Sequence, residues 1–282
     1  MDVVDLRKHP QLSYDYSCEE APNQKDYFMH THTQMEVYLL LAGDLEYHVE
    51  NHIYRPKAGD VMIMRAGEMH TSKAQPEPGG AYERYNIRFS PELLKESLNS
   101  RLLIPFLNRP GGAGNHYPAS QIPSAYIQSC FQRMFSKKED EGGSRVMSYL
   151  IPILQEIYDA WVRRESNQEK QHQMPQDSLA AKIISYINQN LFTLRGPQEL
   201  TDVFFLSQSQ LYRAFHEYTG TSVWDYVRKK RLISARERLQ NGEKPTQAAA
   251  ACGFADYSTF YRAYKRQFEC SPQNDYQAGG KR

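Results

Sequence analysis

The chain has 282 residues, of which 40% are hydrophobic and 24% charged, and its net charge is +1. This length suits two domains, and this composition is that of an ordinary globular protein rather than a disordered or fibrous one. No apolar run reaches the roughly 18 residues that a membrane helix needs, and the charged start of the chain lacks an apolar signal segment. We therefore expect a cytoplasmic protein with no membrane partner.

The charge is unevenly distributed along the chain. From Ser178 to the end there are 15 basic and 9 acidic residues, a net charge of +6, which leaves −5 for the rest. A basic C-terminal part favours a polyanionic partner. The four cysteines are scattered without a CxxC pair, so a zinc site built from them is not expected.

Short β-rich runs come first. Residues 36–41, 46–50 and 61–64 are typical of strands, and glycine-containing turns separate them. Regular short strands of this kind predict an antiparallel sandwich or barrel. Residues 75–80 and 105–118 are rich in proline and glycine, and both predict loops.

Helical patterns follow the strands. Apolar residues recur at helical spacing over 126–134 and again over 147–161, where Pro152 either kinks the helix or marks a later start. Residues 165–177 are polar without an apolar period, as in a linker. The sequence thus predicts an α+β two-domain fold: a β-barrel with flanking helices (residues 1–165, helices within 123–165), a linker (166–177) and an all-α domain (178–282).

The strongest feature of the sequence is an internal repeat. Residues 209–215 read Ser-Gln-Leu-Tyr-Arg-Ala-Phe, and residues 258–264, 49 positions later, read Ser-Thr-Phe-Tyr-Arg-Ala-Tyr. Phe205 and Phe254 align at the same offset. Because repeats disclose architecture, we expect two copies of one helical unit.

Each copy predicts an amphipathic helix. In the first copy, apolar side chains at 211, 214, 215 and 218 fall on one face, and Ser207 is placed to cap the helix with Gln210 as its capping-box partner. In the second copy, Asp256 is placed as the cap. The outward-facing residues, which we expect to meet DNA, are Ser209, Gln210, Tyr212, Arg213, His216, Tyr257, Ser258, Thr259, Tyr261, Arg262, Lys265 and Arg266.

A shorter helix and a tight turn precede each copy. Pro245 suits a first helical position, Gly253 suits a turn that needs positive φ, and residues 222–240 form one long connecting helix. A helix, a short turn and a second helix are typical of the helix-turn-helix, whose second helix enters the major groove of double-stranded DNA.

At this point the sequence resembles a known family. Residues 253–265, Gly-Phe-Ala-Asp-Tyr-Ser-Thr-Phe-Tyr-Arg-Ala-Tyr-Lys, followed by Cys-Ser-Pro at 270–272, look like the signature of the AraC/XylS regulators. The resemblance covers residues 178–276 and implies one domain that sets two recognition helices into successive major grooves. Pro245 and Ala248 depart from the family, which commonly has Ile there, and leave less apolar bulk under the second unit.

The outward side chains divide into base readers and phosphate binders. Gln210 is suited to adenine and Arg213 or Arg262 to guanine, although each can equally contact phosphate. Lys265 and Arg266 are phosphate candidates, as is the basic run at 228–231, which can equally be an ordinary solvated face.

The N-terminal part resembles the cupins. Residues 30–36, His-Thr-His-Thr-Gln-Met-Glu, look like the first cupin motif, and residues 67–70, Gly-Glu-Met-His, look like the second, although Arg65 stands where a proline is usual. Together His30, His32, Glu36 and His70 resemble a cupin site for a divalent transition metal.

Regulators with this N-terminal fold usually sense a small molecule, often a sugar, without a catalytic metal. The same histidines can therefore line an effector pocket or bond within the barrel, and we expect no required cofactor. The expected ligand-binding residues are His30, His32, Glu36, Tyr38, Glu46, His48, Arg65, His70 and Arg88.

We predict a ligand-responsive transcription regulator, which the resemblance implies to be an activator with RNA polymerase as a partner. The alternative is a metal-dependent cupin enzyme with a nucleic-acid-binding appendage, although no catalytic signature appears elsewhere. The apolar stripe at 147–161 either covers the barrel or pairs with its twin in a homodimer.

Overall fold

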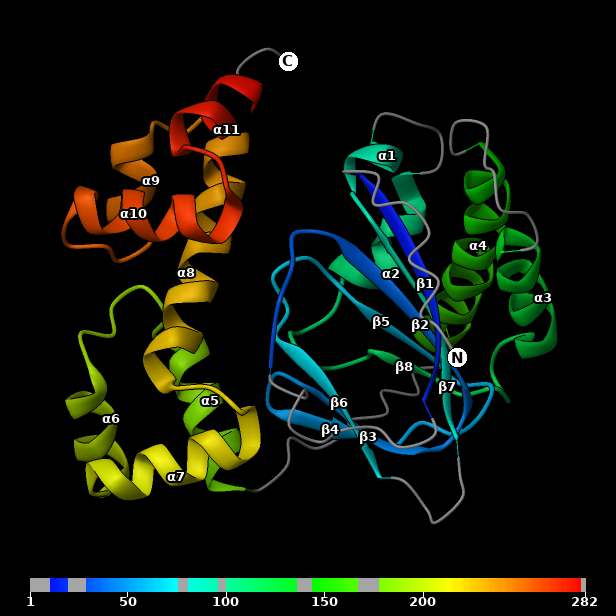
Figure 1. The fold of residues 1–282 in the computed structure, drawn as a ribbon, viewed down its shortest axis with the longest axis horizontal. Helices are drawn as coiled ribbons and strands as arrows, with labels where there is room; N and C mark the ends of the chain where they lie inside the picture. The colour runs from blue at the N-terminus through cyan, green and yellow to red at the C-terminus, as the bar shows by residue number, and fades with distance from the viewer. Residues whose placement is uncertain are drawn as a thin grey trace. The chain divides into compact units, whose positions relative to one another are not determined.

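The computed structural model describes residues 11–19, 29–75, 81–95, 100–135, 144–166 and 178–279 (Figure 1). The chain folds into two compact units, of which the first comprises Met1–Tyr27 and Thr33–Pro175 and the second Phe28–His32 and Gln176–Arg282. Most of the expected linker and most of the loop expected at 75–80 lie outside the described residues. Within the described part of the chain, no helix is long and apolar enough to span a membrane.

The first unit contains two antiparallel sheets. The five-stranded sheet has the order β1 (Leu12–Glu19), β7 (Tyr82–Phe89), β2 (Met35–Ala42), β5 (Val61–Met64) and β8 (His116–Tyr117). The three-stranded sheet has the order β4 (His52–Tyr54), β3 (Asp44–Val49) and β6 (His70–Gln75).

Side-chain alternation gives each face of the five-stranded sheet its own core. On β2, Val37 and Leu39 belong to the core that the sheet shares with the helices. Tyr38 and Leu40 point the other way and pack with residues of the three-stranded sheet, such as Tyr47 of β3. The two sheets therefore face one another across a second core, as the expected barrel or sandwich requires.

The helices of this unit cover the outer face of the larger sheet. They are α1 (Glu92–Lys95), the 3-10 helix η2 (Ser100–Leu103), α2 (Ile104–Leu107), α3 (Ser124–Phe135) and α4 (Ser144–Ser166). Helices α3 and α4 pack side by side (Figure 1). Pro152 lies inside α4 without ending it. The expectation of a plain loop over 105–118 was wrong in part, because α2 and β8 fall within it.

The second unit is all helical. Its helices are α5 (Leu179–Gln189), α6 (Pro197–Phe204), α7 (Gln208–Thr219), α8 (Val223–Gln240), α9 (Pro245–Ala251), α10 (Tyr257–Phe268) and α11 (Pro272–Gly279). Helix α8 connects the pair α6–α7 to the pair α9–α10 (Figure 1). Each pair has the expected short first helix and longer second helix.

The two turns differ in length, which corrects the expected alignment of Phe205 with Phe254. Phe205 ends α6 in the left-handed conformation, with φ of 54°. In the second pair, Gly253 takes the left-handed position, with φ of 78°. One residue lies between Phe205 and the cap Ser207, whereas two residues lie between Gly253 and the cap Asp256. The second turn therefore carries one extra residue, and the structural equivalent of Phe205 is Gly253.

Candidate nucleic-acid interface and effector site

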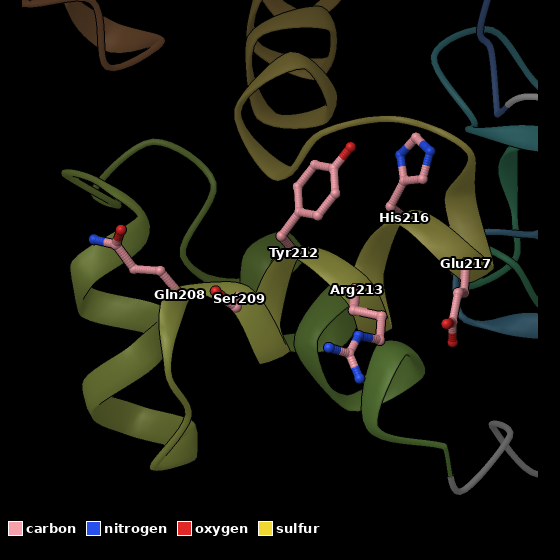
Figure 2. A pocket seen from close by; sticks show the side chains of 6 residues that line it. All are labelled: Gln208, Ser209, Tyr212, Arg213, His216 and Glu217. Carbon is pink, nitrogen blue, oxygen red and sulfur yellow. The ribbon is translucent and has the colours of Figure 1, made fainter.

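Helix α7 presents one polar face to solvent. An open hollow of about 550 Å³ lies along this face, lined by Gln208, Ser209, Tyr212, Arg213, His216 and Glu217 (Figure 2). The opposite face is buried through Leu211, Phe215 and Tyr218. This division follows from the helical spacing of the apolar residues, as expected. Gln208 and Glu217 were not predicted from the sequence, although the same helical spacing places both beside the predicted residues.

The ring of Tyr212 is held over the helix surface. It stacks on His216, one turn later, with ring centroids 5.1 Å apart and planes 11° apart. The Tyr212 side chain is nevertheless 55% exposed. A flat ring fixed in this way, with a free hydroxyl at its tip, suits contact with a sugar-phosphate backbone or a base edge.

Gln210 has a structural role that the sequence analysis also anticipated. Ser207 accepts a hydrogen bond from the Gln210 backbone at 3.2 Å, and the Gln210 side chain accepts one from the Ser207 backbone at 2.9 Å. This is a complete capping box. Reading adenine needs the same carbonyl oxygen as an acceptor, so the base-reading role expected for Gln210 competes with its cap.

Helix α10 repeats the arrangement of α7. Asp256 caps it by accepting a hydrogen bond from the Thr259 backbone at 2.7 Å, while Phe260 and Tyr264 bury its inner face. All the residues expected to point outward are exposed, namely Tyr257, Ser258, Thr259, Tyr261, Arg262, Lys265 and Arg266. Arg213 on α7 and Arg262 on α10 thus occupy equivalent exposed positions.

The basic run at 228–231 does not form one solvated face. Arg228 forms an ion pair with Asp225 on the same helix. Arg231 is buried, with 6% of its surface exposed, and donates to three backbone carbonyls. The expectation that Arg231 contacts phosphate was therefore wrong. Spacing alone did not reveal this, because the groups that cover Arg231 come from distant segments.

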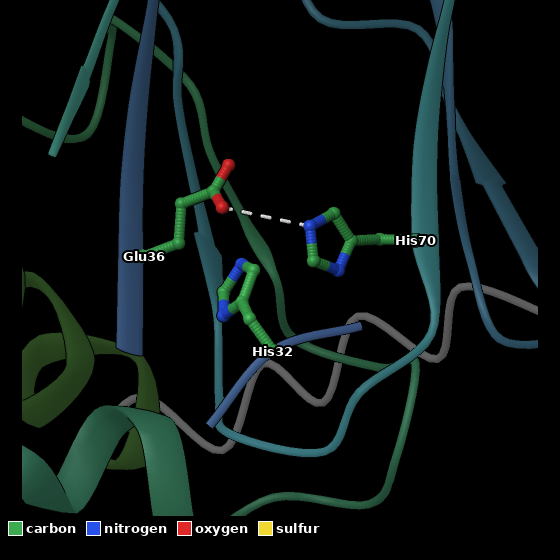
Figure 3. Close-up of side chains that lie close together, drawn as sticks. All are labelled: His32, Glu36 and His70. Atoms are coloured by element: carbon green, nitrogen blue, oxygen red, sulfur yellow. Dashed lines mark ion pairs between the residues drawn. The ribbon is translucent and has the colours of Figure 1, made fainter. Parts of the chain in front are cut away.

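Inside the first unit, Glu36 on β2 faces His70 on β6 (Figure 3). The Glu36 carboxylate lies 3.5 Å from Nε2 of His70, and both side chains are buried. The His70 Nδ1 lies 2.9 Å from the backbone oxygen of Glu68, which orients the ring. Burial disfavours the charged imidazole, but the hydrogen bond and charge of Glu36 outweigh it and raise the pKa of His70.

His32 joins this pair in Figure 3. The figure draws all three side chains, but His32 comes from a segment assigned to the second unit. His30 is outside the group, and its ring is exposed with its centroid 6.3 Å from that of His32. Residues Phe28–His32 belong with the second unit, so only Glu36 and His70 are assigned to the interior of the first.

Strand β7 supplies the predicted Arg88 and a further interior residue, Asn86, that was not predicted from the sequence. Asn86 lies opposite Asp15 of β1 on one side and Tyr38 of β2 on the other. Arg88 lies opposite Glu36 and also 3.6 Å from Asp15. The period-two pattern of residues 82–89 carried this signal, since Arg84, Asn86 and Arg88 alternate with residues of the helix-facing core.

The charges on this face are close together and partly shielded from water. Burial raises the pKa of Asp15, although the guanidinium groups of Arg88 and Arg84 oppose the shift. The side-chain oxygen of Asn86 is buried and has no hydrogen-bond partner among the described residues. A buried acceptor without a partner costs free energy, which a donor from a bound molecule would recover.

The other expected pocket residues take different places. Tyr38 is buried, and its hydroxyl lies 2.8 Å from that of Tyr82. Glu46 and His48 occupy the face of β3 opposite Tyr47, so they do not join Glu36. Burial lowers the pKa of His48 to about 4. Arg65 lies in the turn after β5, where its side chain donates to the backbone oxygen of Arg109 at 3.1 Å.

Comparisons with known proteins identify the family of each part of the chain. Residues 14–149 match the family described as the AraC-like ligand binding domain, and residues 200–277 match that described as the helix-turn-helix domain. Two matched helix-turn-helix units beside a sheet-rich ligand-binding domain define the protein as a DNA-binding transcription regulator. The chain belongs to the AraC/XylS family of transcription regulators.

The chain is also similar to several individual proteins. The HTH-type transcriptional activator RhaR of Yersinia pestis bv. Antiqua (strain Angola) is 24% identical over 89% of this chain and 85% of its own length. The probable transcriptional regulator LumQ of Photobacterium leiognathi is 38% identical over 32% of this chain, a match that spans only 37% of LumQ. The crystal structure of unsaturated fatty acid bound ToxT from Vibrio cholerae is similar over 97% of this chain and 98% of its own, with 11% identity and a TM-score of 0.41.

Family membership decides between the two classes that the sequence left open. The family consists of transcription regulators, and the chain is not an enzyme. The predicted α+β two-domain fold is confirmed as well, with a sheet-rich ligand-binding domain followed by a helical DNA-binding domain.

Proposed function

We propose that this regulator binds two half-sites on one face of DNA, with α7 in one major groove and α10 in the next. The observation that supports this is the equivalence of Tyr212-Arg213 and Tyr261-Arg262, which are exposed at matching positions on two capped helices. Successive major grooves on one face lie about 34 Å apart, so the half-sites are centred about one helical turn from each other.

Footprinting on a selected site tests the two-groove arrangement. Binding sites are first selected from random DNA with the full-length protein, and the bound duplex is then cleaved by hydroxyl radicals. The expected result is two protected segments about one turn apart on the same face. A single protected groove would contradict the proposal.

The effector we propose is a polar molecule rich in hydroxyl groups, such as a sugar or a related metabolite. Asp15 and Glu36 offer acceptors, Arg88 offers donors, and the Asn86 oxygen lacks a partner among the described residues. A hydroxyl group donates one hydrogen bond and accepts others, so a molecule with several hydroxyls matches this mixed set. RhaR, a relative of this chain, is named as an activator, which supports activation as the response.

A matched pair of variants tests the effector site. Glu36→Gln changes a carboxylate on the inner face, and Glu46→Gln makes the same change on the outer face of β3. Thermal shift against a panel of sugars should identify a stabilising ligand. Calorimetry should then show that Glu36→Gln weakens the binding of this ligand at least tenfold, while Glu46→Gln leaves the affinity unchanged. Equal affinities for both variants would place the effector elsewhere.

A divalent transition metal is the second candidate for the interior site. The observation that favours it is the buried pair of an imidazole and a carboxylate, His70 and Glu36, whose ligand atoms lie 3.5 Å apart. The contact between His70 Nδ1 and the Glu68 oxygen turns Nε2 toward Glu36, and ligating histidines are commonly oriented in this way. Metal analysis of protein purified without chelators should then give about one equivalent, and its absence after incubation with Zn²⁺, Fe²⁺ or Mn²⁺ would exclude this candidate.

We also propose a homodimer that acts with RNA polymerase in the cytoplasm. Most of the apolar stripe on α4 packs in the core of its own unit, including Leu150, Leu154 and Ile157. The edge of α4 that carries Val162, which is 39% exposed, remains on the surface, and we propose that a second copy packs against it. Light scattering at micromolar concentration should give twice the chain mass, and a monomer would contradict the dimer.

A further inference from the structure

Arg231 lies in the middle of α8, the helix that the two helix-turn-helix units share. Its guanidinium donates hydrogen bonds to the backbone oxygens of Leu191 at 2.7 Å, Leu194 at 2.6 Å and Gly253 at 2.8 Å. Its central carbon also lies 5.6 Å from the ring centre of Trp224. All three hydrogen bonds go to neutral carbonyls.

These carbonyls come from the two halves of the DNA-binding domain that α8 connects. Leu191 and Leu194 lie in the segment between α5 and α6, which leads into the first helix-turn-helix pair. Gly253 lies in the turn between α9 and α10, which belongs to the second. A single side chain therefore bridges the two halves of the DNA-binding domain, and its planar fork of donors fixes their relative orientation as a flexible ammonium could not.

Gly253 supports the same contact from the other side. A side-chain carbon at this position would lie 2.4 Å from the backbone oxygen of Phe192 and 3.0 Å from the guanidinium carbon of Arg231. Only glycine lets the turn between α9 and α10 approach the segment between α5 and α6 so closely. The contact between the halves therefore depends on the backbone at Gly253 and on the side chain of Arg231 together.

Burying a guanidinium without a carboxylate partner is unfavourable, and burial lowers the pKa of Arg231. Part of this cost is offset by the three carbonyl bonds. A leucine or methionine in the same place would fill the space without desolvating a charge. The arginine therefore calls for an explanation beyond apolar packing.

We propose that Arg231 is a positioning residue that sets the distance and angle between α7 and α10, and hence the half-site spacing that the protein accepts. This inference rests on the proposed binding of two grooves. Arg231 itself touches no DNA in this arrangement. It acts through the segments that lead into the two recognition helices.

The test compares spacing preference with half-site affinity in the full-length protein. Duplexes carry the selected half-sites with the natural separation or with one to five base pairs added or removed, and a further duplex carries one half-site. The variants are Arg231→Met, Arg231→Lys and Gly253→Ala. Two controls match them: Arg238→Met removes an arginine from the same helix, and Gly242→Ala adds a side chain at φ of 86° where no atom lies within 4 Å.

The three variants should bind the natural spacing at least tenfold more weakly than the wild type and show a flattened spacing preference. Their affinity for one half-site should stay within twofold of the wild-type value, and both controls should behave as the wild type. Arg231→Lys keeps the charge, so a loss of spacing preference in that variant assigns the effect to geometry. Thermal melting identifies any variant that fails to fold, and Gly253→Ala then tests the contact without changing Arg231.

Two results would overturn the inference alone: folded variants that keep the wild-type spacing preference, or variants that lose half-site and full-site binding equally. A wild-type protein without any spacing preference would instead overturn the two-groove proposal and this inference with it.

Discussion

The carboxylate of Glu68 accepts two parallel hydrogen bonds from the guanidinium of Arg109, at 2.8 Å on Oε1 and 2.7 Å on Oε2. Both side chains are at least 95% buried. Glu68 also accepts from the Gly112 backbone and from Asn115, at 2.8 and 2.9 Å. One carboxylate near the start of β6 therefore organises the whole segment that runs from α2 to β8.

Glu68→Gln should destabilise the first unit strongly. The substitution leaves the buried Arg109 charge without a partner, and breaking a buried pair in this way costs about 3–5 kcal/mol. Urea unfolding followed by circular dichroism measures the change. Glu46→Gln is the control, because its partner Arg55 is 73% exposed and a pair of that kind contributes about 1 kcal/mol or less. Similar losses of unfolding free energy in Glu68→Gln and Glu46→Gln would contradict the special importance of the buried pair.

The same carboxylate should make stability depend on pH. Burial opposes ionisation, but the charge and hydrogen bonds of Arg109 outweigh it and lower the pKa of Glu68 to about 2. In the unfolded chain the pKa of a glutamate is ~4.3. The folded state therefore gains stability from Glu68 above that value and loses it as the pH falls toward 2. Between pH 6 and pH 2.5, the free energy of unfolding should decline less steeply in Glu68→Gln than in the wild type. Parallel declines in the two proteins would refute this prediction.

Arg213→Ala and Arg262→Ala should each weaken specific DNA binding by about 1–3 kcal/mol. Both side chains are exposed at equivalent positions on α7 and α10. If either reads guanine, its loss also relaxes preference at one base pair, whereas loss of a phosphate contact weakens all sequences alike. Fluorescence anisotropy on the selected site measures both effects. Arg238→Ala on α8 is the charge-matched control. Unchanged DNA affinity in both test variants would contradict the prediction that Arg213 and Arg262 contact DNA.

Phe205→Gly should stabilise the second unit by about 0.5–1 kcal/mol. Phe205 has φ of 54° and is 94% exposed, so it carries left-handed strain without compensating burial. Relief of that strain, about 1–2 kcal/mol, exceeds the added entropy of glycine in the unfolded chain. Phe205→Ala keeps the strain and should change little. A destabilised glycine variant in thermal melting would show that the phenylalanine makes a favourable contact.

The local sequence was enough to predict which side chains α7 and α10 expose. The apolar spacing around Leu211 and Phe260 and the caps Ser207 and Asp256 act within a few residues along the chain. Interactions of that range leave a readable pattern in one segment. For this reason the outward residues of α7 and α10 were predicted correctly as exposed.

The interior of the first unit was predicted less completely. Glu36 and His70 were identified from their motifs, and the structure places them 3.5 Å apart. Asp15 and Asn86 were missed because their importance comes from strand register, which sets them opposite each other although they are far apart in the chain. Glu46 and His48 were grouped with Glu36 by residue type, whereas alternation along β3 puts them on the other face.

By itself the sequence determined the family, the two-domain organisation and the side chains that each recognition helix exposes, because periodicity, caps and turn residues act over short distances. Only the tertiary structure decided what covers those elements. The basic run at 228–231 reads as a surface patch, yet segments about 40 residues before it and 22 residues after it bury Arg231. Burial depends on which distant segments meet, and that is settled when the whole chain packs.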